Sequence, residues 1–251
     1  MKPLGLGCFA LLILCFVAQS SVAGSLSWIT HDRWVTVQRV LDGDTFKTTQ
    51  GERIRLLGIN TPEIQHESPA QPFGKQAKHA LIALIAGQQV RLTFDKEKKD
   101  KYGRTLAHVY LRDGLWVNAA LVQQGFAHVY TFAPNISAAK KLLKLEQQAI
   151  AAKRNMWGDK RWRVLTTQQL RTRLLGQFRL VRGVVTKIGK HGWRFELGKL
   201  TVTVPKRYRS AFKGLNLKLG QHILVRGKLR MSRRGKWFLS IYTSSDAYHI
   251  N

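Results

Sequence analysis

The sequence predicts an α+β protein made of two small β-barrels, with helices packed against the first. Three observations support this prediction: strand candidates fall into two sets of five, clear helical periodicity occurs only in the first set, and the charge changes sharply between the sets. With 251 residues and 44% apolar content, the chain can bury one large core or two small ones.

The first set opens with β-branched and apolar residues at 34–49, WVTVQRVLDGDTFKTT. A turn through TTQGER leads to a third strand candidate, RIRLLGI, at 53–59. The segment at 90–94, VRLTF, alternates apolar and polar residues as a half-buried strand does. The stretch at 104–118, RTLAHVYLRDGLWVN, predicts a strand, an Asp-Gly turn and a second strand.

Helical periodicity lies between and after these strands. Ala77, Ala80, Leu81 and Leu84 have helical spacing, and Gly87 is a plausible C-terminal stop. Two helical runs follow the fifth strand, and we expect Asn135 to cap the second of them. Five strands with an intervening helix are typical of a closed barrel of the OB type.

The second set repeats this arrangement. Its strand candidates are FRLVRGVVTKI, WRFELG, LTVTVP, HILVRGKLRM and WFLSIY, with a polar segment, KRYRSAFKG, between the third and the fourth. We therefore predict a second OB-type barrel over 165–248 after a first one over 34–158.

Charge divides the chain unevenly. The sequence holds 42 Lys and Arg against 14 Asp and Glu, a formal charge of +28, and residues 161–251 contain only Glu196 and Asp246 as acids. Such a charge predicts a polyanionic partner: nucleic acid, an anionic membrane surface or an acidic polysaccharide.

The N-terminus has the pattern of an export signal. Lys2 precedes the apolar run LGLGCFALLILCFVA, which is short for a spanning helix by the ~20-residue rule. The small residues SVA predict cleavage after Ala23, so 1–23 is a predicted signal peptide and the mature protein is expected in the periplasm or the medium. An uncleaved anchor is the alternative. Both cysteines lie in this segment, which excludes a disulfide scaffold or thiolate metal site in the mature chain.

Three short segments carry the residue types that phosphodiester cleavage needs: a cation near the phosphate, an oriented water and positive donors. They are DGDT with Asp42 and Asp44, RIRLLGINTPE with Arg55, Asn60, Thr61 and Glu63, and DKYGR with Lys101, Tyr102 and Arg104. Arginine suits the donor role because its planar fork pairs with two phosphate oxygens. The eight histidines show no metal-ligand pair at short spacing, which argues against a zinc site.

These segments, with LVQQGFA and the MWG ending, make residues 34–158 resemble the staphylococcal nuclease (thermonuclease) family. The resemblance implies calcium-dependent hydrolysis of DNA and RNA to 3′-phosphate products, by one calcium ion held by Asp44, Asn60 and the Thr61 carbonyl. It implies that Glu63 orients or deprotonates the attacking water and that Arg55 and Arg104 clamp the phosphate. It also implies that Lys101 and Tyr102 bind a terminal phosphate and that Tyr130 and Phe132 lie against a base.

One position departs from the family pattern. The family usually has Asp where this chain has Asn60, and an amide oxygen is still a calcium ligand but carries one charge fewer. The role of Asp42 stays open between orienting the turn around Asp44 and a purely structural hairpin role. Tyr130 and Phe132 have a core role as their alternative.

The second predicted barrel interleaves basic and aromatic residues, as in Trp193–Arg194, Tyr208–Arg209 and Arg234–Trp237. OB-folds bind single strands with stacking aromatics in a cationic groove, although these aromatics could also be core residues.

We interpret the sequence as that of an exported metal-dependent nuclease, expected to be a monomer without membrane insertion after signal cleavage. A non-catalytic nucleic-acid-binding protein with a weakened metal site is the alternative, and a polysaccharide-binding protein leaves the three segments unexplained.

Overall fold

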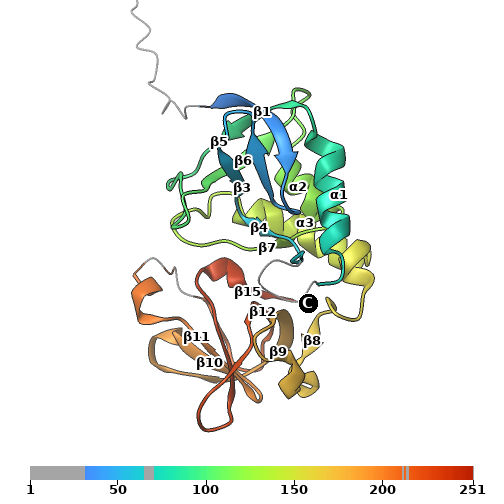
Figure 1. Cartoon of the computed structure of the whole chain (residues 1–251). Helices are drawn as coiled ribbons and strands as arrows, with labels where there is room; N and C mark the ends of the chain where they lie inside the picture. The colour runs from blue at the N-terminus through green and yellow to red at the C-terminus, as the bar shows by residue number, and fades with distance from the viewer. Residues whose placement is uncertain (1–31, 65–70, 211, 213–214, 251) are drawn as a thin grey trace, which may run out of the picture.

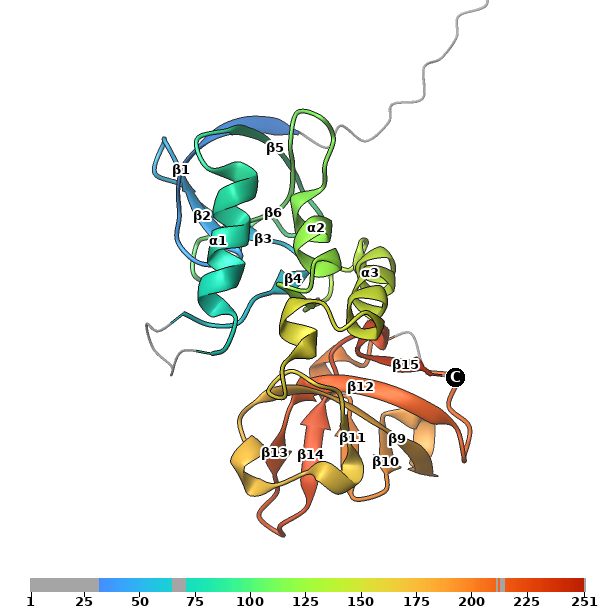
Figure 2. The same ribbon diagram turned by 90° about the vertical axis from the view of Figure 1, so that its right-hand side faces the viewer.

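The computed structural model describes residues 32–64, 71–210, 212 and 215–250 (Figure 1). The predicted signal peptide and its cleavage site lie outside the described residues. Two strand-rich units are stacked, with the first drawn above the second in Figure 1 and a helical layer between them in Figure 2.

The first unit is built on a closed barrel of five strands in the order β1-β2-β3-β6-β5. Neighbouring strands are antiparallel except for β3 and β6, which run parallel. The barrel strands are β1 (Arg33–Val40), β2 (Thr45–Thr48), β3 (Arg53–Leu56), β5 (Gln89–Thr93) and β6 (Thr105–Tyr110). This arrangement confirms the predicted fold class.

Three helices cover the barrel: α1 (Gly74–Ile85), α2 (Val117–Gln123) and α3 (Ala139–Ala151). The buried face of α1 carries Ala77, Leu81 and Ile85, whose side chains are fully buried. Ala77 and Leu81 belong to the predicted apolar face, and its other two members, Ala80 and Leu84, are partly buried against the same core. Gly87 follows the helix with φ 69°, which confirms it as a left-handed stop. A short ladder, β4 (Ile59–Asn60) with β7 (His128–Val129), lies outside the barrel and brings the Asn60 segment beside the chain that leads to Tyr130.

Two local predictions were wrong. The predicted strand after the Asp-Gly turn is only an isolated bridge at Trp116, and the next residue begins α2. The reason is Asn118, whose buried amide accepts a hydrogen bond from the Val109 N–H at 2.9 Å and donates one to the Leu57 carbonyl at 2.9 Å. That pairing ties the segment to the barrel as a helix.

The second error concerns Asn135, which does not cap α3. The residue at the N-cap position is Ala138, and it makes no side-chain capping bond. Asn135 instead exchanges two hydrogen bonds of 2.8 Å with the backbone of Glu97, and so joins two distant loops.

The second unit is one eight-stranded sheet in the order β13-β14-β11-β10-β9-β12-β15, with β8 paired to β9. Its strands are β8 (Leu165–Thr166), β9 (Phe178–Ile188), β10 (Arg194–Leu197), β11 (Leu200–Thr203), β12 (His222–Lys228), β13 (Arg230–Met231), β14 (Trp237–Ser240) and β15 (Ala247–His249). Its 3₁₀ turns are η2 (Thr167–Gln169), η3 (Thr172–Leu174), η4 (Lys190–Gly192), η5 (Lys206–Tyr208) and η6 (Ser244–Asp246), and η1 (Asn155–Gly158) lies in the segment that connects the two units.

The strand order of the second unit parallels that of the first. β9, β10 and β11 are antiparallel neighbours, β11 pairs in parallel with β14, and β12 pairs with β9. The sheet is not a closed barrel within the described residues, so the predicted OB-type barrel at 165–248 stays a prediction.

A shared apolar cluster joins the two units. Met156, Trp157 and Trp162 from the connecting segment pack with Leu180 and Leu224 of the second unit. Beside them Arg226 of β12 pairs with Glu146 of α3, and both side chains are at most 1% exposed. The units are therefore docked through buried contacts as well as connected in sequence. In the described ranges, no helix is both long and apolar enough to cross a bilayer.

Candidate active site

Asp44 is at the centre of the site and is almost completely buried at 6% exposure. One carboxylate oxygen, Oδ2, accepts hydrogen bonds from the Thr61 N–H at 2.9 Å and the Thr61 hydroxyl at 3.3 Å. The other oxygen accepts a bond of 3.1 Å from the Thr45 hydroxyl. The loop after β1 and the segment after β4 are thus held together by one carboxylate.

Gly43 permits this approach. A Cβ atom at this position would lie 2.6 Å from the Thr61 hydroxyl oxygen and 2.7 Å from the Ala77 Cβ. Such distances exclude any side chain without a backbone shift, so packing requires the glycine of the DGDT segment.

Arg55 extends from β3 toward the same carboxylate. Its Nη2 lies 3.0 Å from Asp44 Oδ2 and donates a hydrogen bond of 2.9 Å to Asn60 Oδ1. The Arg55 side chain is mostly buried, at 11% exposure. Arg55 therefore neutralises Asp44 directly, while its Nη1 donates to the Leu56 carbonyl.

The orientation of the Asn60 amide follows from these contacts. Its oxygen faces the Arg55 guanidinium, and its Nδ2 donates to the Thr61 carbonyl at 2.9 Å. A flipped amide would place N–H groups against a guanidinium, which has no acceptor. A carboxylate at this position has no N–H and could not donate to the Thr61 carbonyl, so Asn60 holds this carbonyl by a hydrogen bond that Asp cannot make.

Asp42 and Glu63 border the cluster. Asp42 accepts a hydrogen bond of 3.0 Å from the Asp44 N–H, which supports its predicted role in orienting the turn. Burial and the charge of Asp44 raise the pKa of Asp42 to about 6. Partial burial and the same charge also raise the pKa of Glu63. Burial is the larger cause of both shifts, and the charge of Asp44 adds to it.

The DKYGR segment forms a tight turn before β6. Asp100 accepts bonds from the Tyr102 N–H at 2.9 Å, the Arg104 N–H at 3.0 Å and the Arg104 Nε at 2.7 Å. Partial burial alone would raise the pKa of Asp100, but the bonds from Arg104 and Tyr102 lower it. Lys101 and Tyr102 are exposed on this turn, and the Lys101 Nζ lies 4.9 Å from the Tyr102 ring centroid.

Tyr130 and Phe132 lie in the segment that follows β7. Their rings pack edge to face at 4.7 Å, and Tyr130 is 37% exposed, so it is not a core residue. A cleft of about 670 Å³ is lined by residues of the β3–β4 segment, of the DKYGR turn and of the chain after β7, whereas Asp44, Asn60, Thr61 and Glu63 are not among its lining residues. Its predicted members are Arg55, Lys101, Tyr102, Arg104, Tyr130 and Phe132.

Sequence reasoning missed two groups in this region. Asp100 fixes Arg104, and an Asp three residues before Gly103 is a turn signal that could have identified it. Arg207 of the second unit also lines the cleft, beside Tyr208, which the sequence suggested as a stacking residue of the second unit but not as part of this cleft. No local signal connects either residue with the first unit.

The comparisons with known proteins concern this first unit. Residues 53–159 match the family model described as "Staphylococcal nuclease homologue". The thermonuclease of Staphylococcus intermedius is 40% identical over 125 residues, which cover 48% of this chain and 74% of that protein. The chain belongs to the staphylococcal nuclease family.

Other members of this staphylococcal nuclease family are similar to the chain over comparable lengths. The thermonuclease of Staphylococcus hyicus is 36% identical over 133 residues, covering 51% of this chain and 78% of that protein. A prophage-derived endonuclease of Bacillus subtilis (strain 168) is 39% identical over 129 residues, covering 49% of this chain and 43% of that protein. The family model ends before β8, so it does not include the second unit.

The oxygen groups of this family member fit a hard cation. Asp44, the Asn60 amide oxygen and the Thr61 carbonyl are oxygen ligands of the kind calcium prefers. Within the described residues no group of three or more His, Cys, Asp or Glu could hold an ion, so any such site needs other oxygens.

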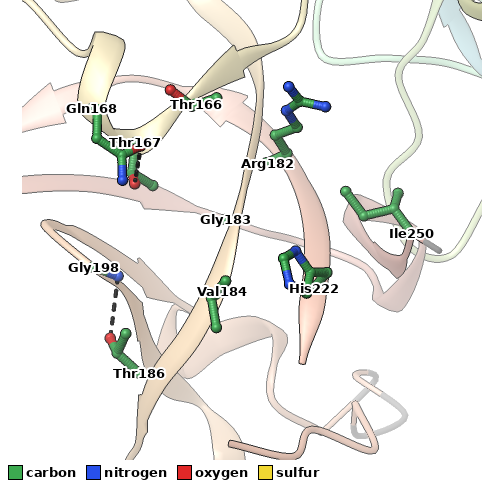
Figure 3. A pocket seen from close by; sticks show the side chains of 10 residues that line it. All are labelled: Thr166, Thr167, Gln168, Arg182, Gly183, Val184, Thr186, Gly198, His222 and Ile250. Carbon is green, nitrogen blue, oxygen red and sulfur yellow. Dashed lines mark hydrogen bonds between the residues drawn. The ribbon is translucent and has the colours of Figure 1, made fainter. Parts of the chain in front are cut away.

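A second hollow of about 410 Å³ lies on the second unit, between β8, β9 and β12 (Figure 3). Arg182 and His222 reach it, and the Thr186 hydroxyl already accepts a bond of 3.1 Å from the Gly198 N–H. The residues drawn around it carry no carboxylate and no pair of aromatic rings. This hollow therefore lacks the carboxylates and paired aromatic rings that line the 670 Å³ cleft.

Proposed function

We propose that this protein is an exported, calcium-dependent nuclease that hydrolyses phosphodiester bonds of DNA and RNA and leaves 3′-phosphate ends. The observation that carries the proposal is the placing of Arg55 and Arg104 in one cleft, next to the buried Asp44 cluster. Family membership makes nuclease chemistry the expected class.

The two arginines supply the positive donors. Preorganised donors stabilise charge that develops on the phosphate oxygens in the transition state, and their value rises in a site from which water is excluded. Arg104 is oriented by its Nε bond to Asp100, which leaves its terminal nitrogens available for phosphate. Arg55 is oriented by Asp44 and Asn60.

Glu63 is the proposed acceptor of the proton from the attacking water. Its pKa is raised by burial and by Asp44, which brings a carboxylate closer to the basicity that general-base catalysis near neutral pH requires. The water oxygen bonds to phosphorus as its proton passes to Glu63, and the bond from phosphorus to the 5′ oxygen breaks. The departing 5′ oxygen takes a proton from solvent, so one product keeps the 3′-phosphate and the other a 5′-hydroxyl.

Asp44, Asn60 and the Thr61 carbonyl would hold calcium. When bound, the ion supplies positive charge close to the scissile phosphate. A single carboxylate with neutral oxygens makes a weak site that substrate oxygens complete.

The test is release of acid-soluble fragments from DNA and from RNA, with calcium and then with chelator. Calcium-dependent release with 3′-phosphate ends supports the proposal. Nucleic-acid binding without release under either condition supports the alternative, a binding protein whose metal site is weakened by Asn60. Export is tested separately, by locating the protein after cell fractionation and sequencing its N-terminus, which we expect to begin at Gly24.

A further inference from the structure

The cleft has a second wall that the family segments do not supply. Arg207 and Tyr208 of η5 line the same 670 Å³ cleft as Arg55 and Arg104. η5 is the polar segment between β11 and β12, in the second unit. The catalytic cleft is therefore bounded by both units.

A continuous path of aromatic rings connects the two walls. Phe132 lies 5.4 Å from Tyr242, and Tyr242 packs edge to face with Tyr208 at 5.1 Å. Tyr130, Phe132, Tyr208 and Tyr242 thus form a row that starts beside the first unit's cleft residues and ends in the second unit. Successive rings of this kind are surfaces on which successive bases of a single strand stack.

Positive charge accompanies this row. The Arg207 guanidinium lies 4.8 Å from the Tyr208 ring centroid, is exposed, and has no ion-pair partner among the described residues. The cleft lining holds five basic side chains, Arg55, Lys99, Lys101, Arg104 and Arg207, against the acids Glu97 and Asp100. Such a lining is complementary to a phosphate backbone.

The position of this wall is fixed by burial. Arg226 donates to Glu146 and to the Val129 carbonyl at 3.0 Å, one residue before Tyr130. His128 stacks on Phe178 of β9 at 4.5 Å. The second unit is thus held against the segment that carries Tyr130 by buried contacts. The position of η5 relative to the cleft therefore follows from this packing and not only from the connecting segment.

We propose that Arg207 and Tyr208 form an additional substrate subsite, which binds a phosphate and a base of a single-stranded segment flanking the bond that is cut. The inference rests on the proposed nuclease function. It assigns to the second unit a direct role in holding the strand, not only an electrostatic one.

The test uses the full-length chain with Arg207→Ala, Tyr208→Ala and Tyr208→Phe. Arg233→Ala is the matched control, because Arg233 is exposed on the hairpin between β13 and β14, at the end of the second unit farthest from the first in Figures 1 and 2. KM and kcat are measured on a 20-nucleotide single strand and on a dinucleotide. Binding of the labelled 20-nucleotide strand is measured by anisotropy in chelator, where no cleavage is needed.

We expect Arg207→Ala and Tyr208→Ala each to raise KM and Kd for the long strand about fivefold or more, with kcat and dinucleotide cleavage unchanged. Arg207→Ala should also reduce the slope of log affinity against log salt by ~0.7, the release expected for one phosphate contact. Tyr208→Phe should restore affinity because its ring still stacks.

Equal effects of Arg207→Ala and Arg233→Ala would overturn the subsite and leave only bulk charge. Unchanged anisotropy in both alanine variants would overturn it as well. If the native chain cuts neither DNA nor RNA, the proposed function fails, and the anisotropy series still decides the subsite.

Discussion

Arg226 of β12 and Glu146 of α3 form a two-pronged ion pair that is fully buried between the two units. Glu146 also accepts a hydrogen bond of 2.7 Å from the Val129 N–H, so its carboxylate is shared by helix, ladder and second unit. Buried charges are tolerated only when they are paired and hydrogen-bonded.

We expect Arg226→Met to lower the free energy of unfolding by about 3–5 kcal/mol, because it leaves the Glu146 charge buried without a partner. The double variant Arg226→Met/Glu146→Gln should recover much of that loss, since the Gln oxygen can still accept from Val129. Denaturant unfolding of both variants is the measurement. Arg91→Met is the control: its pair with Asp32 is part-exposed, and its loss should cost below about 1 kcal/mol. A loss below about 1 kcal/mol for Arg226→Met would contradict the role of this ion pair in stabilising the fold.

Replacing Arg55 or Arg104 by Ala should lower kcat by roughly 10²-fold or more, by comparison with removal of one preorganised donor. Arg55→Ala should also lower Tm because Asp44 loses its buried counter-charge, whereas Arg104→Ala should leave Tm nearly unchanged. Arg39→Ala, on the exposed face of β1, is the control for loss of one positive charge. Normal turnover in both cleft variants would refute their role.

Asn60→Asp should lower the calcium concentration needed for half-maximal cleavage, since ligand charge tunes calcium affinity. The saturated rate should change little, because Arg55 can still pair with the new carboxylate. Calcium titrations of initial rates compare the two forms. Identical titrations would mean that residue 60 does not contact the ion, and activity only in the variant would favour the binding-protein alternative.

Gly43→Ala should impair the site without touching any charged residue. Its Cβ would overlap the Thr61 hydroxyl at 2.6 Å, so the segment carrying the Thr61 carbonyl must move. We expect a large loss of calcium-dependent cleavage and a lower Tm. Gly192→Ala, at a glycine with open space around its Cβ position but φ 67°, controls for backbone strain alone. A fully active Gly43→Ala variant would show that the close approach is dispensable.

His108 should make the first unit sensitive to acid. Burial lowers the pKa of His108 to about 4, only partly opposed by Asp95. Below pH 6.5, the ordinary pKa of histidine, the His108 imidazole binds a proton in the unfolded chain but not in the folded chain. The free energy of unfolding therefore falls as the pH drops from 6.5 to 4. The full effect is about 3 kcal/mol.

His108→Phe keeps an aromatic ring against Trp116, 5.2 Å away in the native structure, and cannot titrate. We expect the Tm of this variant, relative to native, to rise progressively as the pH is lowered through that window. A difference that stays constant from pH 7 to 4 would show that His108 is not linked to folding.

The barrel strands could be predicted because alternation along VRLTF and similar runs is a local property of the sequence. Local patterns failed where a distant contact decides the outcome. Asn118 holds α2 against the backbone of Val109 and Leu57, and Asn135 serves Glu97 instead of a helix end. In both cases tertiary hydrogen bonds outweighed local propensity.

The candidate site divides in the same way. Asp44, Arg55, Asn60 and Thr61 lie in short segments that could be identified, and the structure joins them in one hydrogen-bonded network. The wall that includes Arg207 depends on how two units dock, and docking is set by buried pairs between residues far apart in sequence. Neither periodicity nor motif spacing contains that information.

The pairing of Arg226 with Glu146 also has a consequence in time. Glu146 is synthesised 80 residues before Arg226. At a ribosomal rate of ~5–20 residues per second, the helix face that carries Glu146 waits about 4–16 s for its partner. During that interval the first unit can close its barrel, but the surface around Glu146 and Trp162 has nothing to pack against. If the chain folds as it is synthesised, it therefore passes through a stage in which the first unit is complete and its partly apolar docking face is uncovered. Export of the unfolded chain would postpone folding until the whole chain is available.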